Sequence, residues 1–428
     1  MVPSRFSCPV WRRPDRDRIV VAPVGSREVV DLVVVGAGFQ GLSTALAAAR
    51  SGMIVRMVEA RNVGEGASGL NGGQVIPGLK YDPEWLIARF GEEKGERLID
   101  FASRTADAVF DLIEGEGLDV EHLRNGWIQA AHTHTAMGNA EERNRQWRAR
   151  GADVTLLNAS DIALMTGAHG YLGGWLDRRA GVINPLAFVC ELARLAVEAG
   201  VRLATGETVT GLRQESGAWT VSLSGGQSIS ARTVLLATNA YSGHLVPGLA
   251  QSLVPLHSFQ IATAPLNEAQ QEAILPHGQA VSDSRRILVY YRKSPDGRLV
   301  LGGRGRMSEP KSEKDWAHLQ RAMLRLFPAL GDISIANRWF GRVAVTPDHL
   351  PHVHEPEKGL LMVAGCQGRG VGLMTAIGPR LAKYIETGDR TALPFPVSAI
   401  HPIPFHGLRQ IGVAAAIAWY RLLDGLEK

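Results

Sequence analysis

The stretch GAGFQG at residues 36–41 constrains the fold more than any other part of this sequence. The apolar run LVVV precedes it at 32–35, and an Ala- and Leu-rich run follows at 42–50, close to Gly52. Successive β-branched residues without polar alternation predict a strand that is covered on both faces of a parallel sheet. Alanine and leucine favour a helix, and glycine commonly ends one. The pattern therefore predicts a strand, a glycine turn and a helix.

The glycines of this turn have separate physical roles. Gly36 permits a tight turn, Gly38 lets the backbone approach a pyrophosphate, and Gly41 lets the helix lie close to the strand. Phe39 and Gln40 lie between them at the amino end of the helix. Free N–H groups and a partial positive charge at that end attract phosphate. The turn thus predicts a phosphate-binding site.

An acidic residue completes the pattern. The next predicted strand, 53–58, leads to Glu59, whose carboxylate can accept hydrogen bonds from an adenosine ribose. Ala60 and Arg61 follow it, and Arg61 does not replace the carboxylate as a reader of a 2′-phosphate would. The context predicts a dinucleotide site, and it leaves open whether the ligand is a mobile nicotinamide or a resident flavin.

Bulk composition excludes several classes of protein. A chain of 428 residues is long enough for two or more domains. The net charge of +4 is too small to predict a nucleic-acid partner. Cys8, Cys190 and Cys366 lie far apart and predict neither disulfides nor a metal site, so a cytoplasmic location is expected. No apolar run reaches transmembrane length, and the run at 411–423 predicts a short amphipathic helix.

Strand and helix patterns occur at the start, middle and end of the chain, with helical and antiparallel segments between them. This order predicts an α/β fold with a doubly wound, Rossmann-like domain built from discontinuous segments. A second, α+β domain with an antiparallel sheet is expected to bind the substrate. The expected segments are an N-terminal arm over the surface at 1–29, the first domain at 30–80, 180–250 and 335–428, and the second domain at 81–179 (largely helical) and 251–334.

Six stretches occur in order between residues 30 and 410: VVVGAGFQGLSTALAAARSG, EGASGLNGGQ, LLATNAYSG, YYRKSPDGRLVLGGRG, WFGRVAVTPDHLPHV and VAGCQGRGVGLMTAIGPRLAKYI. Together they resemble the FAD-dependent amine and amino-acid oxidoreductases of the D-amino-acid oxidase superfamily, in particular the gamma-glutamylputrescine oxidase-like branch. The resemblance implies FAD bound in an extended form, with a substrate domain that closes over the flavin ring. Some relatives have a lysine near the flavin where Val300 stands in this sequence.

The resemblance also implies which residues contact FAD. They are Gly36, Gly38, Phe39, Gln40, Gly41, Glu59, Ala60, Arg61, Ala67, Ser68, Asn71, Gly72, Gly73, Gln74, Val209, Thr238, Asn239, Gly341, Gly368, Arg369, Gly370 and Val371. Physical reasoning supports several of them. Glycines in the loop at 64–79 permit close approach, and polar residues after the buried strand at 233–237 lie where open α/β sheets bind ligands.

The last glycine turn, 365–370, lies between a predicted strand at 360–364 and a predicted helix at 371–386. A helix amino end there, aided by Arg369, would stabilise the negative charge of a reduced flavin. We expect Arg369, Arg342 and Tyr291 as catalytic residues. Structural roles stay open for all three: a solvated side chain beside a structural glycine turn for Arg369, a buried ion pair for Arg342 and strand packing for the tyrosine.

Tyr290, Arg304 and Gln367 are expected to contact the substrate, and no metal is expected. The predicted reaction oxidises the C–N bond of a small amine or amino acid. A neutral amine passes a hydride to flavin N5, and water hydrolyses the resulting imine. Oxygen, a quinone or an electron carrier would reoxidise the flavin. The alternatives are a nicotinamide-dependent dehydrogenase and a flavin-holding subunit without turnover of its own.

Overall fold

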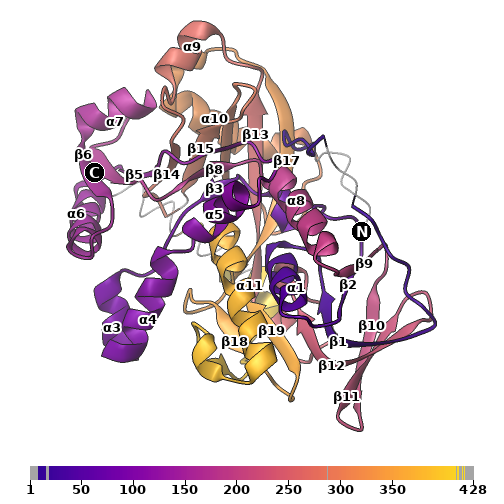
Figure 1. Cartoon of the computed structure of the whole chain (residues 1–428). Helices are drawn as coiled ribbons and strands as arrows, with labels where there is room; N and C mark the ends of the chain where they lie inside the picture. Colours follow the sequence, from indigo (N-terminus) through magenta and orange to yellow (C-terminus); the bar gives the residue numbers. More distant parts are fainter. Residues whose placement is uncertain are drawn as a thin grey trace.

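The computed structural model describes residues 8–15, 19–286, 288–410, 412, 413, 417 and 419. Within this part of the chain, the strands form three sheets, and the first sheet lies below the second in Figure 1. The strand order in the first sheet is β20 (Val397–Ser398), β18 (His352–His354), β19 (Leu360–Ala364), β12 (Ser228–Leu236), β1 (Arg27–Val35), β2 (Val55–Glu59) and β9 (Arg202–Thr205). β19, β12, β1, β2 and β9 run parallel to one another. The predicted α/β class and a Rossmann-like domain built from separated segments of the chain are confirmed.

The centre of this sheet is buried on both faces, as its apolar run predicted. Leu32 and Val34 of β1 pack into the core beneath the helices. Val33 and Val35 pack into a second core on the opposite face. The antiparallel hairpin of β10 (Val209–Glu215) and β11 (Ala218–Leu223) covers that face and joins the sheet through β12.

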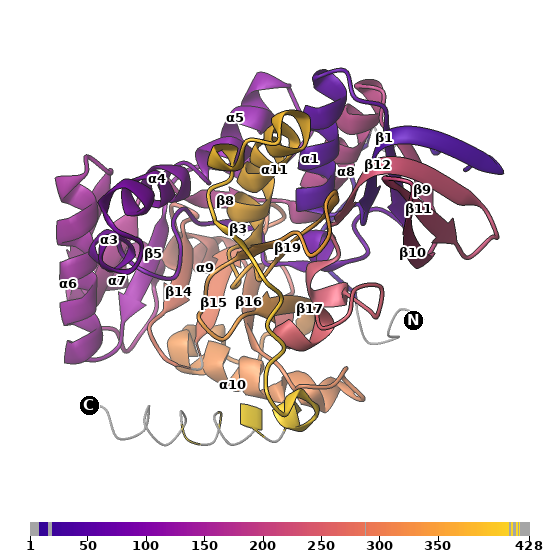
Figure 2. The same ribbon diagram turned by 90° about the horizontal axis from the view of Figure 1, so that it is seen from below.

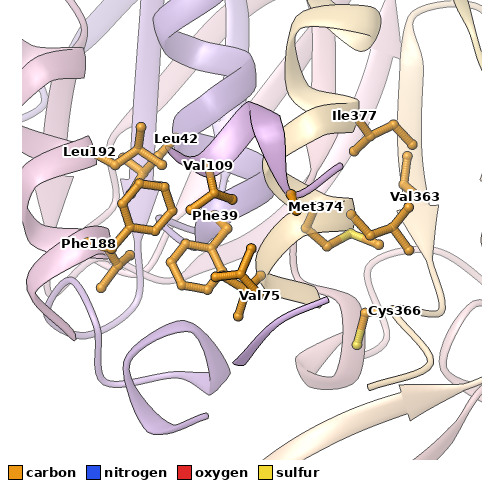
Figure 3. Packing of buried hydrophobic residues seen from close by; sticks show 14 of the residues in the cluster. Phe39, Leu42, Val75, Val109, Phe188, Leu192, Val363, Cys366, Met374 and Ile377 are labelled. Atoms are coloured by element: carbon orange, nitrogen blue, oxygen red, sulfur yellow. The ribbon is translucent and has the colours of Figure 1, made fainter. Parts of the chain in front are cut away.

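Helices α1 (Phe39–Arg50), α8 (Pro185–Glu198) and α11 (Gly370–Thr387) cover the other face (Figure 1). α1 packs against both of the others. Figure 3 shows Phe39, Leu42 and Phe188 meeting on one side of this core and Val363, Met374 and Ile377 on the other. The first, middle and last parts of the chain therefore meet around α1.

The second sheet has the strand order β17 (Ile335–Val345), β13 (Val254–Thr263), β16 (Leu299–Arg304), β15 (Val289–Lys293), β14 (Ala280–Asp283), β5 (Trp127–Ala131), β7 (Gly173–Asp177) and β6 (Val154–Asn158). One face packs against α10 (Ala317–Leu326), which lies beneath the sheet in Figure 2. Helix α9 (Glu268–Ala273) lies at one end, and helices α6 (His134–Ala149) and α7 (Ala159–Thr166) pack at the edge that β6 forms. The other face is turned towards the first domain.

The segment at 81–179 is less helical than its sequence pattern predicted. It contains α3 (Pro83–Phe90), α4 (Glu92–Ser103) and α5 (Asp107–Gly115), together with the α6 and α7 helices. However, it also supplies β5, β6 and β7 to the second sheet, and β4 (His122–Leu123) to the small third sheet β3-β8-β4. The other members of that sheet are β3 (Gln74–Val75) and β8 (Gly181–Ile183).

The two ends of the chain differ from the expectation in different ways. At the start, Trp11 is buried with 6% of its surface exposed, so this part of the expected surface arm packs inward, and β1 already begins at Arg27. At the end, the helix predicted at 411–423 lies mostly outside the described residues. No helix among the described residues is long and apolar enough to cross a membrane.

Candidate functional site: a dinucleotide cavity between two sheets

The turn between β1 and α1 is built for close approach by a ligand. Gly36 has a φ of +104°, a conformation that residues with a Cβ rarely adopt. A Cβ on Gly38 would lie 2.9 Å from the hydroxyl of Ser68. That hydroxyl accepts a hydrogen bond of 3.1 Å from the N–H of Phe39, the first residue of α1. The amino end of the helix and the loop at 64–72 therefore meet at one point.

Glu59 lies at the carboxyl end of β2, beside this turn. Its two carboxylate oxygens accept backbone N–H bonds from Ala37, at 2.9 Å, and from Arg61, at 3.0 Å. These bonds fix the orientation of the carboxylate. Each oxygen keeps a further lone pair, which is what the two hydroxyl groups of a ribose require.

A cavity of about 1420 Å³ extends from this turn to the facing surface of the second sheet. Predicted residues that line it are Gly36, Gly38, Phe39, Gln40, Glu59, Ala60, Arg61, Ala67, Ser68, Asn71, Gly72, Gln74, Val209, Thr238, Asn239, Tyr290, Gly341, Arg342, Gln367, Gly368, Arg369, Gly370 and Val371. Segments that are distant in the sequence thus contribute to one continuous space.

Four predicted residues do not line the cavity, namely Gly41, Gly73, Tyr291 and Arg304. Gly41 faces the sheet, where a Cβ would lie 3.1 Å from Val34 Cγ1, so it serves the close packing of α1. Gly73 packs instead against the carbonyl of Ile183 and the guanidinium of Arg292.

The structure does not support the expected catalytic role of Tyr291 or the expected substrate contact of Arg304, because neither residue lines the cavity. Side chains alternate along a strand, so Tyr290 faces the cavity while Tyr291 points into the opposite core. Tyr291 is fully buried there and packs edge-on against Phe327, at 5.3 Å between ring centroids. Arg304 ends β16 outside the cavity, where its carbonyl accepts a hydrogen bond from His318.

Gln40 shows that the cavity suits a polar cofactor. Its side chain is 4% exposed and lines the cavity, and its amide nitrogen and oxygen have no hydrogen-bond partner among the described residues. An unpartnered buried amide costs about 1–3 kcal/mol, so a ligand that donates and accepts hydrogen bonds is expected beside it. Together with the glycine turn and Glu59, this amide fits the polar groups of FAD.

The turn before α11 is held by side chains from other segments. Gly365 donates a backbone hydrogen bond of 3.0 Å to Oδ1 of Asn239. Gln367 has a φ of +52°, and its amide nitrogen donates to Thr346, at 2.6 Å, and to the carbonyl of Leu350, at 3.2 Å. The side chain of Gln367 is thus engaged by the protein, which favours a role in shaping the turn over the predicted substrate contact.

Arg369 is the residue immediately before α11. Its guanidinium donates a 2.5 Å hydrogen bond to the carbonyl of Pro77 and lies 5.6 Å from the ring centre of Trp127. Burial, followed by the charge of Arg143, lowers the pKa of Arg369 to about 10. The group therefore remains positive near neutral pH, beside the free N–H groups of the helix.

Arg342 occupies the side of the cavity formed by β17. Its guanidinium forms an ion pair of 3.0 Å with Glu309 and lies 5.3 Å from the ring centre of Tyr241. Arg342 thus forms an ion pair, as its structural alternative expected, but the pair is partly exposed rather than buried, with 21% and 38% of the two side chains accessible. It does not exclude contact with a ligand, because Arg342 also lines the cavity.

On the second sheet, Tyr290 and Ser258 face the cavity and share a 2.7 Å hydrogen bond. Burial raises the pKa of Tyr290 to about 12. Gly302 lies directly against the tyrosine ring, since a Cβ there would overlap it. The ring is therefore fixed, and its hydroxyl stays protonated.

Among the cavity residues that escaped the sequence analysis, Gln260 and Lys80 bear most directly on the substrate. Gln260 of β13 is fully buried, and its amide nitrogen donates to the carbonyl of Leu70 at 2.8 Å. That carbonyl can only accept, so the amide oxygen is the atom left without a partner in the described chain. The alternation in SFQIATAPL could have placed Gln260 and Ser258 on one face, but the sequence does not show what that face meets.

Lys80, another residue that was not predicted, follows the glycine-rich loop and lines the cavity. Lys80 is exposed to solvent, but the surrounding protein, and then the charges of Arg369 and Arg143, still lower the pKa of its ammonium. Nearby, Arg143 pairs with Asp82 through two hydrogen bonds of 2.7 and 3.0 Å. No such bond or ion pair holds the ammonium of Lys80 in the described part of the chain, so it is available to an anionic ligand. No local motif marks this lysine in the sequence.

Comparison with known proteins identifies the family of this site. The family model described as FAD dependent oxidoreductase matches residues 31–384. The chain belongs to this family of FAD-dependent oxidoreductases. It is 31% identical to the probable oxidoreductase OrdL of Rhizobium meliloti (strain 1021) over 418 residues, covering 96% of this chain and 95% of the relative.

A further relative agrees with the family assignment, and a solved structure agrees with the fold. The chain is 30% identical to gamma-glutamylputrescine oxidoreductase of Escherichia coli (strain K12), covering 92% and 93% of the two chains. The solved structure of glycine oxidase from Geobacillus kaustophilus superposes with a TM-score of 0.72 at 20% identity, covering 88% of this chain and 99% of that chain. The predicted family, fold and FAD cofactor are confirmed, and the nicotinamide-dependent alternative is set aside.

Proposed function

We propose that this oxidoreductase oxidises the C–N bond of a small amine or amino acid that also carries an anionic group, as gamma-glutamylputrescine does. The observation that carries the proposal is the set of polar groups that line the cavity outside the dinucleotide turn. An unpartnered amide oxygen on Gln260, a fixed tyrosine hydroxyl on Tyr290 and an available ammonium on Lys80 line the same space. The name of the Escherichia coli relative supports the same substrate class.

Each of these groups has a role that follows from its chemistry. The amide oxygen of Gln260 accepts an N–H bond from the substrate amine. The ammonium of Lys80 pairs with a carboxylate at the other end of the substrate. Tyr290 acts as a hydrogen-bond donor, because a pKa raised to about 12 keeps its proton in place at physiological pH. Together they orient a neutral amine with its α-carbon towards the first sheet.

FAD, when bound, supplies the redox chemistry by accepting a hydride from the carbon next to nitrogen. The amine nitrogen then loses a proton, and the imine product is hydrolysed by water to a carbonyl compound and an amine or ammonia. The chain contributes a fixed positive field, since Arg369 and the amino end of α11 line the cavity. A neutral amine needs no obligatory protein base for this step.

The test is anaerobic mixing of purified protein with polyamine derivatives, secondary amines and D- and L-amino acids. Loss of the yellow flavin absorbance with a carboxylate-bearing amine is the expected result. Repeating the reaction in air distinguishes an oxidase, whose flavin is reoxidised by oxygen, from a dehydrogenase that needs a quinone or electron carrier. A yellow protein that no amine bleaches would instead support the flavin-holding subunit.

A further inference from the structure

The N-terminal segment at residues 8–14 packs onto the dinucleotide cavity, although it lies outside the strand–turn–helix unit in the sequence. Pro9 and Arg13 line the cavity. The backbone N–H of Cys8 donates a 2.7 Å hydrogen bond to the carbonyl of Arg338 in β17. The amide of Asn184 donates to the carbonyl of Arg12 at 2.9 Å. The segment is thus held at both of its ends.

Trp11 connects this segment to the loop beside the cofactor turn. Its indole ring meets Trp339 edge-on at 5.9 Å, and the guanidinium of Arg292 lies 5.1 Å from its ring centre. Its Nε1–H donates a 2.8 Å hydrogen bond to the carbonyl of Asn71. Asn71 and its neighbour Gly72 both line the cavity.

Hydrogen bonds continue from Asn71 to helix α1. The amide nitrogen of Asn71 donates to the carbonyl of Ser68 at 2.7 Å, and its amide oxygen accepts from the N–H of Gly73 at 2.8 Å. The hydroxyl of Ser68 then accepts from the N–H of Phe39. A chain of short contacts therefore runs from Trp11 to the helix end that faces the phosphates.

Arg13 braces the neighbouring loop. Its guanidinium donates a 3.0 Å hydrogen bond to the carbonyl of Val63, directly before the glycine-rich stretch, and lies 3.5 Å from Sγ of Cys190. Because Arg13 also lines the cavity, it adds positive charge to a space that receives the anionic pyrophosphate of FAD.

We infer that Arg13 is a cofactor-site residue and Trp11 a positioning residue that acts through Asn71, and that the segment at 8–14 retains FAD by bracing the loop at 63–72 and closing one wall of its cavity. The inference concerns the cofactor alone and holds for any substrate. Slower cofactor release is its direct consequence, because the loop must move away from α1 before FAD can leave.

The test compares FAD release from the wild-type holoenzyme and from Trp11→Phe, Arg13→Gln and Arg12→Gln. Phenylalanine keeps an apolar ring and removes the N–H donor. Arg12 is the matched control, since its side chain is exposed like that of Arg13 but has no hydrogen bond or ion pair within the described residues. Release is followed by the rise of free-flavin fluorescence after dilution, at a temperature where circular dichroism shows that all apoproteins stay folded.

We expect Trp11→Phe and Arg13→Gln to release FAD about tenfold faster, since a lost hydrogen bond of about 1.4 kcal/mol corresponds to that factor. Arg12→Gln should match the wild type. The stabilisation of the protein by FAD, measured as the difference in Tm between holo and apo forms, should shrink in the first two variants only. Wild-type release rates and Tm differences in both would overturn the inference, as would a lower apo Tm with unchanged release.

Discussion

Replacing Gly41 with alanine tests the physical reading of the dinucleotide turn most directly. A methyl carbon on Gly41 would lie 2.1 Å from the carbonyl oxygen of Gly36 and 3.2 Å from Cβ of Ala237. Ordinary contacts require about 3.5 Å or more. The obstacle is backbone, which cannot rotate away, so α1 must move off the sheet by more than about 1 Å. The cofactor turn must then open with it.

The expected change in the free energy of unfolding of Gly41→Ala is the sum of two opposing effects. Overpacking against rigid backbone costs about 3 kcal/mol, at the upper end of its usual range, while alanine gains about 1 kcal/mol of helix propensity over glycine. The net loss in the free energy of unfolding is therefore about 2 kcal/mol. FAD affinity should fall as well, because the N–H groups that face the phosphates move with the helix.

Gly138, inside α6, is the matched control. It is also a helical glycine, but a Cβ there has no heavy atom within 4 Å. Gly138→Ala should therefore gain about 1 kcal/mol, which separates the two variants by about 3 kcal/mol. Urea unfolding of the apoproteins followed by circular dichroism measures the difference, and flavin fluorescence measures retention. Equal stability of the two variants, with FAD fully retained by Gly41→Ala, would refute this account of the turn.

Three further predictions concern the cavity. Lys80→Gln should raise KM about two- to fivefold for an amine with a carboxylate, since an ion pair with an exposed lysine contributes up to about 1 kcal/mol, and leave KM unchanged for an amine without one. Because the pKa of Lys80 is lowered, wild-type KM in steady-state assays should rise at a lower pH than an ordinary lysine would give. Gln260→Leu should reduce kcat/KM about 10- to 100-fold by removing the acceptor for the amine, and an unchanged value would contradict that role. Burial raises the pKa of Asp283 to about 6, so the stability it contributes is present below pH 3.8 and is lost as pH rises through 6. Thermal melts from pH 3 to 8 should show this loss in the wild type and not in Asp283→Asn.

The dinucleotide turn was predictable because all its determinants are local. The strand, the three glycines, the helix and Glu59 lie within one short stretch, and their spacing follows from backbone geometry. Predicted element bounds were less accurate at the start. β1 begins at Arg27, five residues before the continuous apolar run, because it pairs with β12 from Ser228 onward.

The substrate end of the cavity was less predictable because its contacts join distant segments. Tyr290 and Tyr291 differ only in the face of β15 that they occupy, and which face meets the cavity depends on how the second sheet docks on the first. The charges of Lys80 and Arg369 interact although the two residues are 289 positions apart in the sequence (369 − 80). A single sequence gives no local signal for such a pairing, so the residue that best indicates an anionic substrate was missed.

The charge of this cavity has a further consequence for the proposed reaction. Lys80 and Arg369 line the cavity in which the amine is proposed to bind. The positive charge of each lowers the pKa of a nearby amine, as Arg369 does for Lys80 itself. A substrate that is an ammonium ion in solution would therefore lose its proton more readily in the cavity. Its carboxylate would in turn be stabilised by the same field. The arrangement thus favours the neutral amine with a charged carboxylate, which is the form able to transfer a hydride without a protein base.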